Sequence, residues 1–273
     1  MMSLEFAVCS AVATLRAQGL PSSALELATL SLDDDSDQGR LWELKGLLHA
    51  DQGEVELARK ALETANSLVP LQPEGRCTLA ECYTLEGMTD LARDLFCSLV
   101  EWDQTQTTLL LRIASSFDRI GRADLSVHAC RKASLRDPGF ARPFYEMAYY
   151  MRRCQYPPHL IESMARHAVQ LDPDSISYRI GLAAFLHSLN RMQDAYQVIS
   201  DMTLGQLRRV TCHCCLTRLV DVCEAGNDLE RTQACHERLL EITSGIGDET
   251  DASHSDTEAS LLWNNRLRLG QGE

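Results

Sequence analysis

The sequence predicts an all-α protein built as a solenoid of stacked helical hairpins, and three observations support this prediction. The 273-residue chain is 45% hydrophobic but only 6% aromatic, so Ala, Leu, Val and Cys must form most of its core. Such a core suits close-packed helices better than a β-sandwich, which favours β-branched and aromatic residues. Small residues and turn glycines also recur every 34 residues. Within each repeat the apolar residues are three or four positions apart, which places them on one face of a helix.

The 34-residue period is clearest in three consecutive segments. The first contains, in order, Trp42, Gly46, Gly53, Ala58, Leu62, Ala65 and Pro70. Two successive shifts of 34 residues give Arg76, Ala80, Gly87, Ala92, Phe96, Leu99 and Gln104, then Leu110, Ala114, Gly121, Ser126, Cys130, Ala133 and Pro138. With small insertions near Pro158 and Val210, seven units fill residues 1–245. They begin near residues 5, 39, 73, 107, 141, 176 and 212.

Each unit is expected to contain two helices joined by a tight turn. Glycine and asparagine tolerate the left-handed conformation that closes a helix, and they mark the turns at Gly19, Gly53, Gly87, Gly121, Asn190 and Gly226. Proline cannot continue a helix, so Pro70, Pro138 and Pro173 should end the second helix of their units. A single hairpin cannot bury its apolar face, so the units must stack.

Two units carry the features of a known repeat. The second unit has Trp42, Gly46, Ala58 and Pro70 in phase, and the third has Leu79, Ala80, Tyr83, Ala92 and Phe96. This pattern resembles the tetratricopeptide-repeat (TPR) family. The resemblance implies a right-handed superhelical solenoid of about seven TPR-like repeats, whose first helices line a concave groove that binds protein partners. Pentatricopeptide and half-a-TPR repeats share the helical pair and are the alternatives.

Composition and charge restrict the classes of function. Lys and Arg total 26 against 39 Asp and Glu, giving a net charge of −13, which disfavours nucleic-acid binding because phosphate contacts need a basic surface. No apolar run approaches the roughly 20 residues that span a bilayer. The apolar run 6–15 follows Glu5 and is interrupted by Arg16, so we interpret it as a helix of the fold. Eleven scattered cysteines favour a reducing, cytoplasmic location.

Enzyme motifs are absent from the sequence. It contains no glycine-rich phosphate loop, no His-Glu-x-x-His and no Gly-x-Ser-x-Gly. The acids between Asp33 and Asp37 fall in the connection between the first two units and are typical of a solvated loop. We therefore expect a non-catalytic interaction scaffold that needs no cofactor.

A second stripe on the first helix of each unit, at positions 2, 5, 9 and 12, predicts a polarised groove. Units two and three contribute the acids Glu43, Asp51, Glu74 and Glu81 on or beside it. Units four and five contribute arginines and tyrosines, namely Arg112, Arg119, Arg142, Tyr145, Tyr149, Arg152 and Arg153. Arginine holds carboxylates in a bidentate manner and tyrosine supplies rigid contact area. These residues predict a site for a partner peptide with an acidic segment, although ordinary solvated helix faces would give the same pattern.

Two functions of other classes remain as alternatives. Cys212, Cys214 and Cys215 are clustered, and Cys235 belongs to the partner helix of the same hairpin. A thiolate-rich Zn site from Cys212, Cys215 and Cys235, or a redox module, is therefore possible in the last repeat, whereas buried cysteine packing as a small hydrophobe is the simpler interpretation. RNA binding by a helical-repeat surface is the other alternative, and a steep salt dependence of binding would reveal it.

The periodicity stops after residue 245. Residues 246–259 are polar and acidic and predict a flexible linker, whereas residues 260–273 regain apolar residues and predict a capping helix or tail. The acidic linker could also dock on the basic groove and compete with a partner. Deletion of residues 246–273 should then tighten peptide binding.

Overall fold

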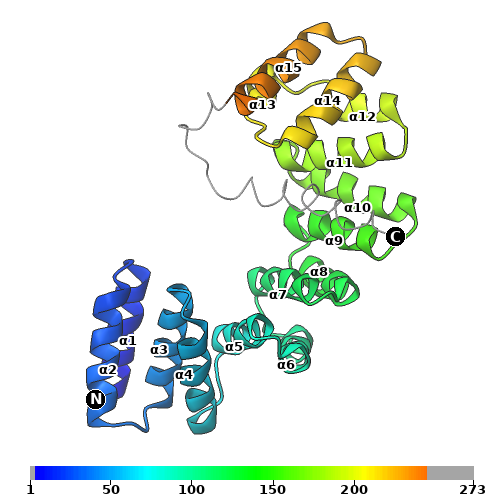
Figure 1. The fold of residues 1–273 in the computed structure, drawn as a ribbon. Helices are drawn as coiled ribbons and strands as arrows, with labels where there is room; N and C mark the ends of the chain where they lie inside the picture. Colours follow the sequence, from blue (N-terminus) through cyan, green and yellow to red (C-terminus); the bar gives the residue numbers. More distant parts are fainter. Residues whose placement is uncertain (1–3, 245–273) are drawn as a thin grey trace. The chain divides into compact units, whose positions relative to one another are not determined.

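The computed structural model describes residues 4–244, and within this range it contains α-helices and no β-strand (Figure 1). The all-α helical-repeat prediction is confirmed. The predicted acidic linker and C-terminal helix, residues 246–259 and 260–273, lie outside the described residues. The chain divides into two compact units, one ending at Ala133 and the other beginning at Ser134. None of the helices in the described range is long and apolar enough to cross a membrane.

The first unit is a series of helical hairpins. Its helices are α1 (Leu4–Ala17), α2 (Pro21–Asp34), α3 (Gly39–Asp51), α4 (Val55–Leu68), α5 (Pro73–Leu85), α6 (Thr89–Glu101), α7 (Thr107–Arg119) and α8 (Ala123–Arg136), which runs three residues past the boundary. Helices α1 and α2, α3 and α4, and α5 and α6 pack as antiparallel pairs, and each first helix also contacts the next, from α1 to α3, α5 and α7. Stacked first helices therefore form one continuous side of this unit.

The second unit repeats this design with one addition. Its helices are α9 (Ala141–Arg153), α10 (Pro158–Leu171), α11 (Ile176–Ser188), α12 (Met192–Ile199), α13 (Leu204–Arg208), α14 (His213–Ala225) and α15 (Leu229–Thr243). The hairpins are α9 with α10, α11 with α12, and α14 with α15. The short helix α13 packs on α15, and it begins with a capping box between Thr203 and Gln206. The 34-residue pattern does not predict α13, because this helix belongs to no repeat.

Small residues allow the close approach of the helices. Ala80, Ala114, Ala148 and Ala183 occupy the same position in successive first helices, and all four are buried. In the second repeat this position is Gly46, where a Cβ atom would lie only 2.6 Å from Cγ of Leu62. Larger side chains at these positions would separate the paired helices.

The turns within the hairpins use left-handed residues, as predicted, with one correction. Gly19, Gly53, Gly87 and Gly121 all have positive φ, and so does Asn190. Gly226, however, has a φ of −82°, and the left-handed residue of that turn is Asn227. Gly226 serves another purpose, since a Cβ atom there would lie 2.4 Å from the ring of Tyr196. The prediction for Gly226 was therefore wrong about its backbone conformation.

Candidate peptide-binding site

The seven residues predicted to line the groove are divided between the two units. Arg112 and Arg119 lie on α7 of the first unit, whereas Arg142, Tyr145, Tyr149, Arg152 and Arg153 all lie on α9 of the second. In the second unit, the helices beside α9 that continue the same side are α11 and α14, which contact each other. The candidate site is therefore built here from α9, α11 and α14.

Arg142 begins the α9 series and already holds a carboxylate. Its side chain is exposed, and its Nε atom donates a hydrogen bond of 2.6 Å to Oε1 of Glu146, one turn further along the helix. The Glu146 side chain is only 3% exposed. A buried carboxylate is costly unless it is paired, so Arg142 compensates a charge within its own helix. A peptide carboxylate would have to compete with Glu146 for this guanidinium.

Tyr145 is a packing residue between successive first helices. It is fully buried, its hydroxyl donates a hydrogen bond of 3.1 Å to the carbonyl oxygen of Ser177, and its ring lies 4.6 Å from the ring of Tyr178. Gly181 makes room for it, because a Cβ atom there would lie 2.1 Å from the Tyr145 hydroxyl oxygen. The structure thus places Tyr145 against α11 and away from solvent, where it fixes the position of α11 relative to α9.

Tyr149 is also largely covered. Its exposed fraction is 5%, and its ring meets that of Tyr150 edge-on with 5.1 Å between the ring centroids. Edge-to-face aromatic pairs stabilise a core beyond the area they bury. The two tyrosines of α9 that were predicted to contact a peptide therefore form a rigid layer beneath the surface.

Arg152 combines with residues of α11 and α14 to form the most distinctive feature of this side. Its guanidinium carbon lies 6.0 Å from the centroid of the Phe185 ring on α11. Burial lowers the pKa of Arg152, and the positive charge of Arg218 on α14 lowers it further. Arg152 therefore lies near both the Phe185 ring and the charge of Arg218, and we name Arg152, Phe185 and Arg218 the arginine face. Arg153, the next residue of α9, is exposed.

Phe185 and Arg218 were not identified from the sequence. They stand at positions 10 and 7 of their units, whereas Arg152 stands at position 12 of its own. The search for a site used one fixed set of repeat positions, so it could not bring these three residues together. Their proximity depends on side-chain length and on the packing of three helices, which the repeat pattern does not encode.

In the first unit the predicted groove residues pair with one another. Arg112 donates a 2.7 Å hydrogen bond from Nε to Glu81 and a 3.0 Å bond from Nη2 to the hydroxyl of Thr78, and the bond to Glu81 raises the pKa of Arg112. Glu74 accepts a hydrogen bond from Arg16. Arg112 also lines a recess of about 390 Å³ between α5 and α7. Arg119 is exposed in the last turn of α7.

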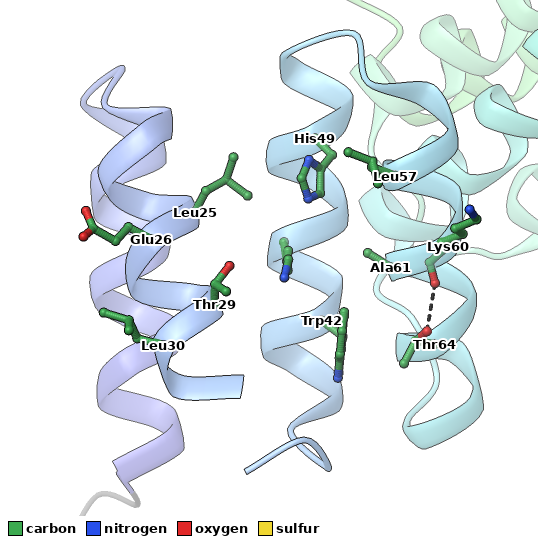
Figure 2. Close-up of a pocket in the computed structure, with 11 residues that line it drawn as sticks. Leu25, Glu26, Thr29, Leu30, Trp42, His49, Leu57, Lys60, Ala61 and Thr64 are labelled. Atoms are coloured by element: carbon green, nitrogen blue, oxygen red, sulfur yellow. Dashed lines mark hydrogen bonds between the residues drawn. The ribbon is translucent and has the colours of Figure 1, made fainter. Parts of the chain in front are cut away.

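A larger recess, of about 660 Å³, is lined by residues of α2, α3 and α4 (Figure 2). The Trp42 side chain lies between α3 and α4 in Figure 2, and Nζ of Lys45 is 5.2 Å from the Trp42 ring centroid. Leu30 and Leu57 line the opposite walls, and both are about half exposed. This recess involves second helices, and the sequence pattern assigned those helices to packing alone.

The cysteines of the last hairpin are not assembled as the Zn hypothesis requires. Among residues 4–244, no group of three His, Cys, Asp or Glu side chains could hold a metal ion. Cys235 instead hydrogen bonds with Cys223, and Cys212 lies beside Cys214 with 3.0 Å between the sulfur atoms. The triad of Cys212, Cys215 and Cys235 is therefore not formed.

Comparison with known proteins gives structural matches. Neither a family model nor a curated protein sequence matches the chain. Among solved structures, it is similar to the C-terminal part of a TPR repeat-containing protein from Cytophaga hutchinsonii, with a TM-score of 0.65 and 13% identity over 92% of this chain and 98% of that one. It is also similar to PilF of Pseudomonas aeruginosa, with a TM-score of 0.57 and 16% identity over 76% of this chain and 96% of that one. A third match is YrrB, described as a TPR protein with an unusual peptide-binding site. Its TM-score is 0.53, with 17% identity over 67% of this chain and 90% of that one.

The hairpins, their stacked first helices and the small residues between them define an all-α helical-repeat protein. The structural matches make this class specific: the chain has the fold of tetratricopeptide-repeat proteins.

Proposed function

We propose that this protein is a cytoplasmic interaction scaffold without catalytic activity of its own, and that its arginine face holds an acidic segment of a partner protein. The observation that carries the proposal is that Arg152 lies near both the Phe185 ring and the charge of Arg218. The arrangement provides two guanidinium groups from different helices and an apolar ring beside Arg152. Such a combination matches a peptide in which an acidic residue neighbours an apolar one.

The electrostatics of Arg152 explain why this face should bind a carboxylate. Arg152 is partly buried, and Arg218 disfavours its charge. A carboxylate placed between the two guanidinium groups would stabilise both charges, and it could accept bidentate hydrogen bonds from either. The ring of Phe185 helps to hold Arg152 in place before the peptide arrives, which reduces the entropy lost on binding.

The supporting layer beneath this face favours a preformed site. The tyrosine layer on α9 and the bond from Tyr145 to Ser177 fix α9 against α11. A rigid base keeps the guanidinium groups in position, so less binding energy is lost in ordering them. One structural neighbour, YrrB, is described as having a peptide-binding site, which makes a peptide a reasonable first ligand to test.

A direct test uses fluorescence anisotropy with a labelled peptide of alternating acidic and apolar residues. The matched peptide carries Asn and Gln in place of Asp and Glu. We expect the acidic peptide to bind and the amide peptide to bind at least tenfold more weakly. We also expect Arg152→Gln and Arg218→Gln each to weaken binding about tenfold, since a charge-assisted hydrogen bond contributes about 1.5–3 kcal/mol.

The control variant is Arg166→Gln, which removes an arginine of similar exposure from the second helix α10. It should leave the affinity unchanged. Equal binding of the acidic and amide peptides, or an equal loss in all three variants, would show that only the general charge of the protein is involved. Either result would reject the arginine face as the binding site.

A further inference from the structure

Three cysteines surround the start of helix α14 in the second unit. Cys212 is the N-cap residue, with extended backbone angles of φ −86° and ψ 115°, and Cys214 and Cys215 lie in the first turn. The sulfur atoms of Cys212 and Cys214 are 3.0 Å apart. Cys212 and Cys214 are both partly exposed, whereas Cys215 is buried. The pair is therefore close enough to react and remains accessible to a small oxidant.

The N-cap position favours the thiolate form of Cys212. A hydrogen bond from the Cys215 thiol lowers the pKa of Cys212 most, burial opposes this effect, and bonds from the Cys214 thiol and the backbone N–H groups of Cys214 and Cys215 lower it further, to about 5. A thiolate at an N-cap accepts the unsatisfied N–H groups of the first turn, as an Asp side chain does. Thiolates at helix N-termini are the usual reactive cysteines.

The neighbouring thiol has the complementary character. Burial raises the pKa of Cys214 to about 11, and the negative charge of Cys212 contributes to this rise. Cys214 therefore stays protonated at neutral pH while Cys212 is ionised. Cys212 is therefore the first nucleophile, and Cys214 gives up its proton as it attacks in the second step.

Three cysteines of the first unit behave in the opposite way. Burial raises the pKa of Cys97 and of Cys77, and it raises that of Cys82 to about 11. These cysteines lie within helices of the first unit and serve packing. The hydrogen bond from Cys223 also lowers the pKa of Cys235, but both of those cysteines are buried, whereas Cys212 and Cys214 are partly exposed.

We propose that Cys212 and Cys214 form a redox-active pair that closes reversibly to a disulfide when it meets a hydroperoxide. In the first step the Cys212 thiolate attacks one oxygen of hydrogen peroxide. The S–O bond forms as the O–O bond breaks, and the departing hydroxide takes up a proton to leave as water. The sulfur is oxidised to a sulfenic acid, and the peroxide is reduced.

In the second step the Cys214 sulfur attacks the Cys212 sulfur. The S–S bond forms as the S–O bond breaks, and the leaving hydroxide takes the Cys214 proton and departs as a second water molecule. A low-molecular-weight thiol reverses the change: two such thiols are oxidised to their own disulfide, and Cys212 and Cys214 are returned to thiols. Arg218 of the arginine face lies one turn from Cys214 on α14, and its charge acts on the Cys214 thiol. The peroxide reaction needs no peptide, so it can be tested without peptide binding.

The test exposes the purified chain to equimolar hydrogen peroxide and maps the product by mass spectrometry. Trypsin cleaves after Arg209 and Arg218, so one peptide, residues 210–218, contains all three cysteines. We expect this peptide to lose two hydrogen masses and to regain them after treatment with a thiol. Cys212→Ser should abolish the loss. Serine is itself a favourable N-cap, so α14 should persist, and circular dichroism would verify this.

The other variants identify the partner of Cys212. In Cys214→Ser the reaction should stop at the sulfenic acid, which dimedone would trap, whereas Cys215→Ser should still form the disulfide. The reverse pattern would overturn the pairing of Cys212 with Cys214. Persistence of the mass loss in Cys212→Ser would overturn the role of Cys212.

Alkylation kinetics provide a second readout. An ordinary thiol with a pKa near 8.5 is about 3% ionised at pH 7, so iodoacetamide should modify Cys212 at least tenfold faster than Cys97. As the pH rises, the rate of Cys212 alkylation should reach half of its plateau near pH 5. Cys97→Ser is the matched control and should change neither the peroxide reaction nor the fast alkylation phase. Alkylation of Cys212 at the rate of Cys97 would refute the proposal.

Discussion

The two units solve the same packing problem with different chemistry. In the first unit, salt bridges join successive first helices: Arg16 on α1 binds Asp51 at the end of α3 and Glu74 on α5, and Arg112 on α7 binds Glu81 on α5. In the second unit Tyr145 of α9 makes the corresponding contact with Ser177 and Tyr178 of α11, whereas His187 of α11 pairs with Asp221 of α14. One repeat period therefore tolerates either polar or aromatic contacts between repeats.

The two units also differ in the residues that form their turns. In the first unit, all four left-handed turn residues are glycines, whereas in the described part of the second unit they are Gln155, Asn190 and Asn227. Glycine adopts positive φ without steric cost and asparagine tolerates it, whereas glutamine is strained there. The comparison teaches that the second unit accepts a strained turn at Gln155 and uses an aromatic contact between α9 and α11. The first and the last of the predictions that follow test this difference.

The largest effect should come from the aromatic contact. Tyr145→Ala removes a fully buried ring, and we expect it to lower the free energy of unfolding by about 3–5 kcal/mol. Arg112→Gln removes a salt bridge whose arginine side chain is 39% exposed, and solvent screening should limit its cost to about 1 kcal/mol or less. Urea unfolding followed by circular dichroism would measure both values.

Two controls sharpen this comparison. Tyr145→Phe keeps the ring and loses only the hydrogen bond to Ser177, so it should cost about 1 kcal/mol. Hydrogen exchange should show that Tyr145→Ala increases exchange mainly in α9–α12. If Arg112→Gln destabilises the protein as much as Tyr145→Ala, the aromatic contacts do not distinguish the second unit.

A smaller, pH-dependent effect should arise at the start of α15. Asp228 is its N-cap, and it accepts bonds from the backbone N–H of Arg231, the Arg231 guanidinium and the hydroxyl of Tyr196. Burial opposes ionisation, but these bonds outweigh it and lower the pKa of Asp228. The lowered pKa means that the stabilisation is complete above the unfolded-state pKa near 3.9. It is lost as the pH falls through the lower folded-state pKa.

We therefore expect Asp228→Ala to cost about 1–2 kcal/mol at pH 7, and this difference from the wild type should shrink below about pH 4. Asp228→Asn keeps a capping oxygen without a titratable charge, so its difference from Asp228→Ala should not vary with pH. Thermal unfolding between pH 3 and pH 7 would measure all three proteins. A difference that grows on acidification would contradict the assigned role of Asp228.

The repeat period predicted the hairpins because helix packing imposes small residues at fixed spacing. The first helices begin at Gly39, Pro73, Thr107, Ala141 and Ile176, and a period of 34 residues carries each of these starts to the next within one residue. The period does not predict α13, which is an insertion between hairpins. The Thr203 and Gln206 capping box that starts it is visible in the sequence, but it is too short a signal to be interpreted without a following apolar pattern.

The site was harder to predict than the fold. A repeat position shows which way a side chain leaves its own helix, but it does not show what the next repeat places there. Tyr145 was expected to face the groove, yet Ser177, Tyr178 and Gly181 of α11 cover it. Likewise, the cysteine cluster was visible in the sequence, but the pairing of Cys212 with Cys214 follows from the position at which α14 begins.

The smallest effects should appear at the turns, where they isolate backbone conformation. At Gly87 a Cβ atom would contact nothing within 4 Å, so Gly87→Ala tests only the cost of positive φ for a residue with a side chain, about 1 kcal/mol. Gln155→Gly relieves the same strain in the second unit but makes the unfolded chain more flexible, so we expect a gain of about 0.5 kcal/mol.

Asn227→Gly should lie near zero, because Asn tolerates the left-handed region. Urea unfolding would measure the three variants in parallel. A gain in stability for Gln155→Gly, no change for Asn227→Gly and a loss for Gly87→Ala would show that the second unit carries turn strain that the first unit avoids. A loss of stability in Gln155→Gly would mean that the Gln155 side chain makes contacts worth more than its backbone strain, and the contrast between the two sets of turns would then rest on side-chain contacts.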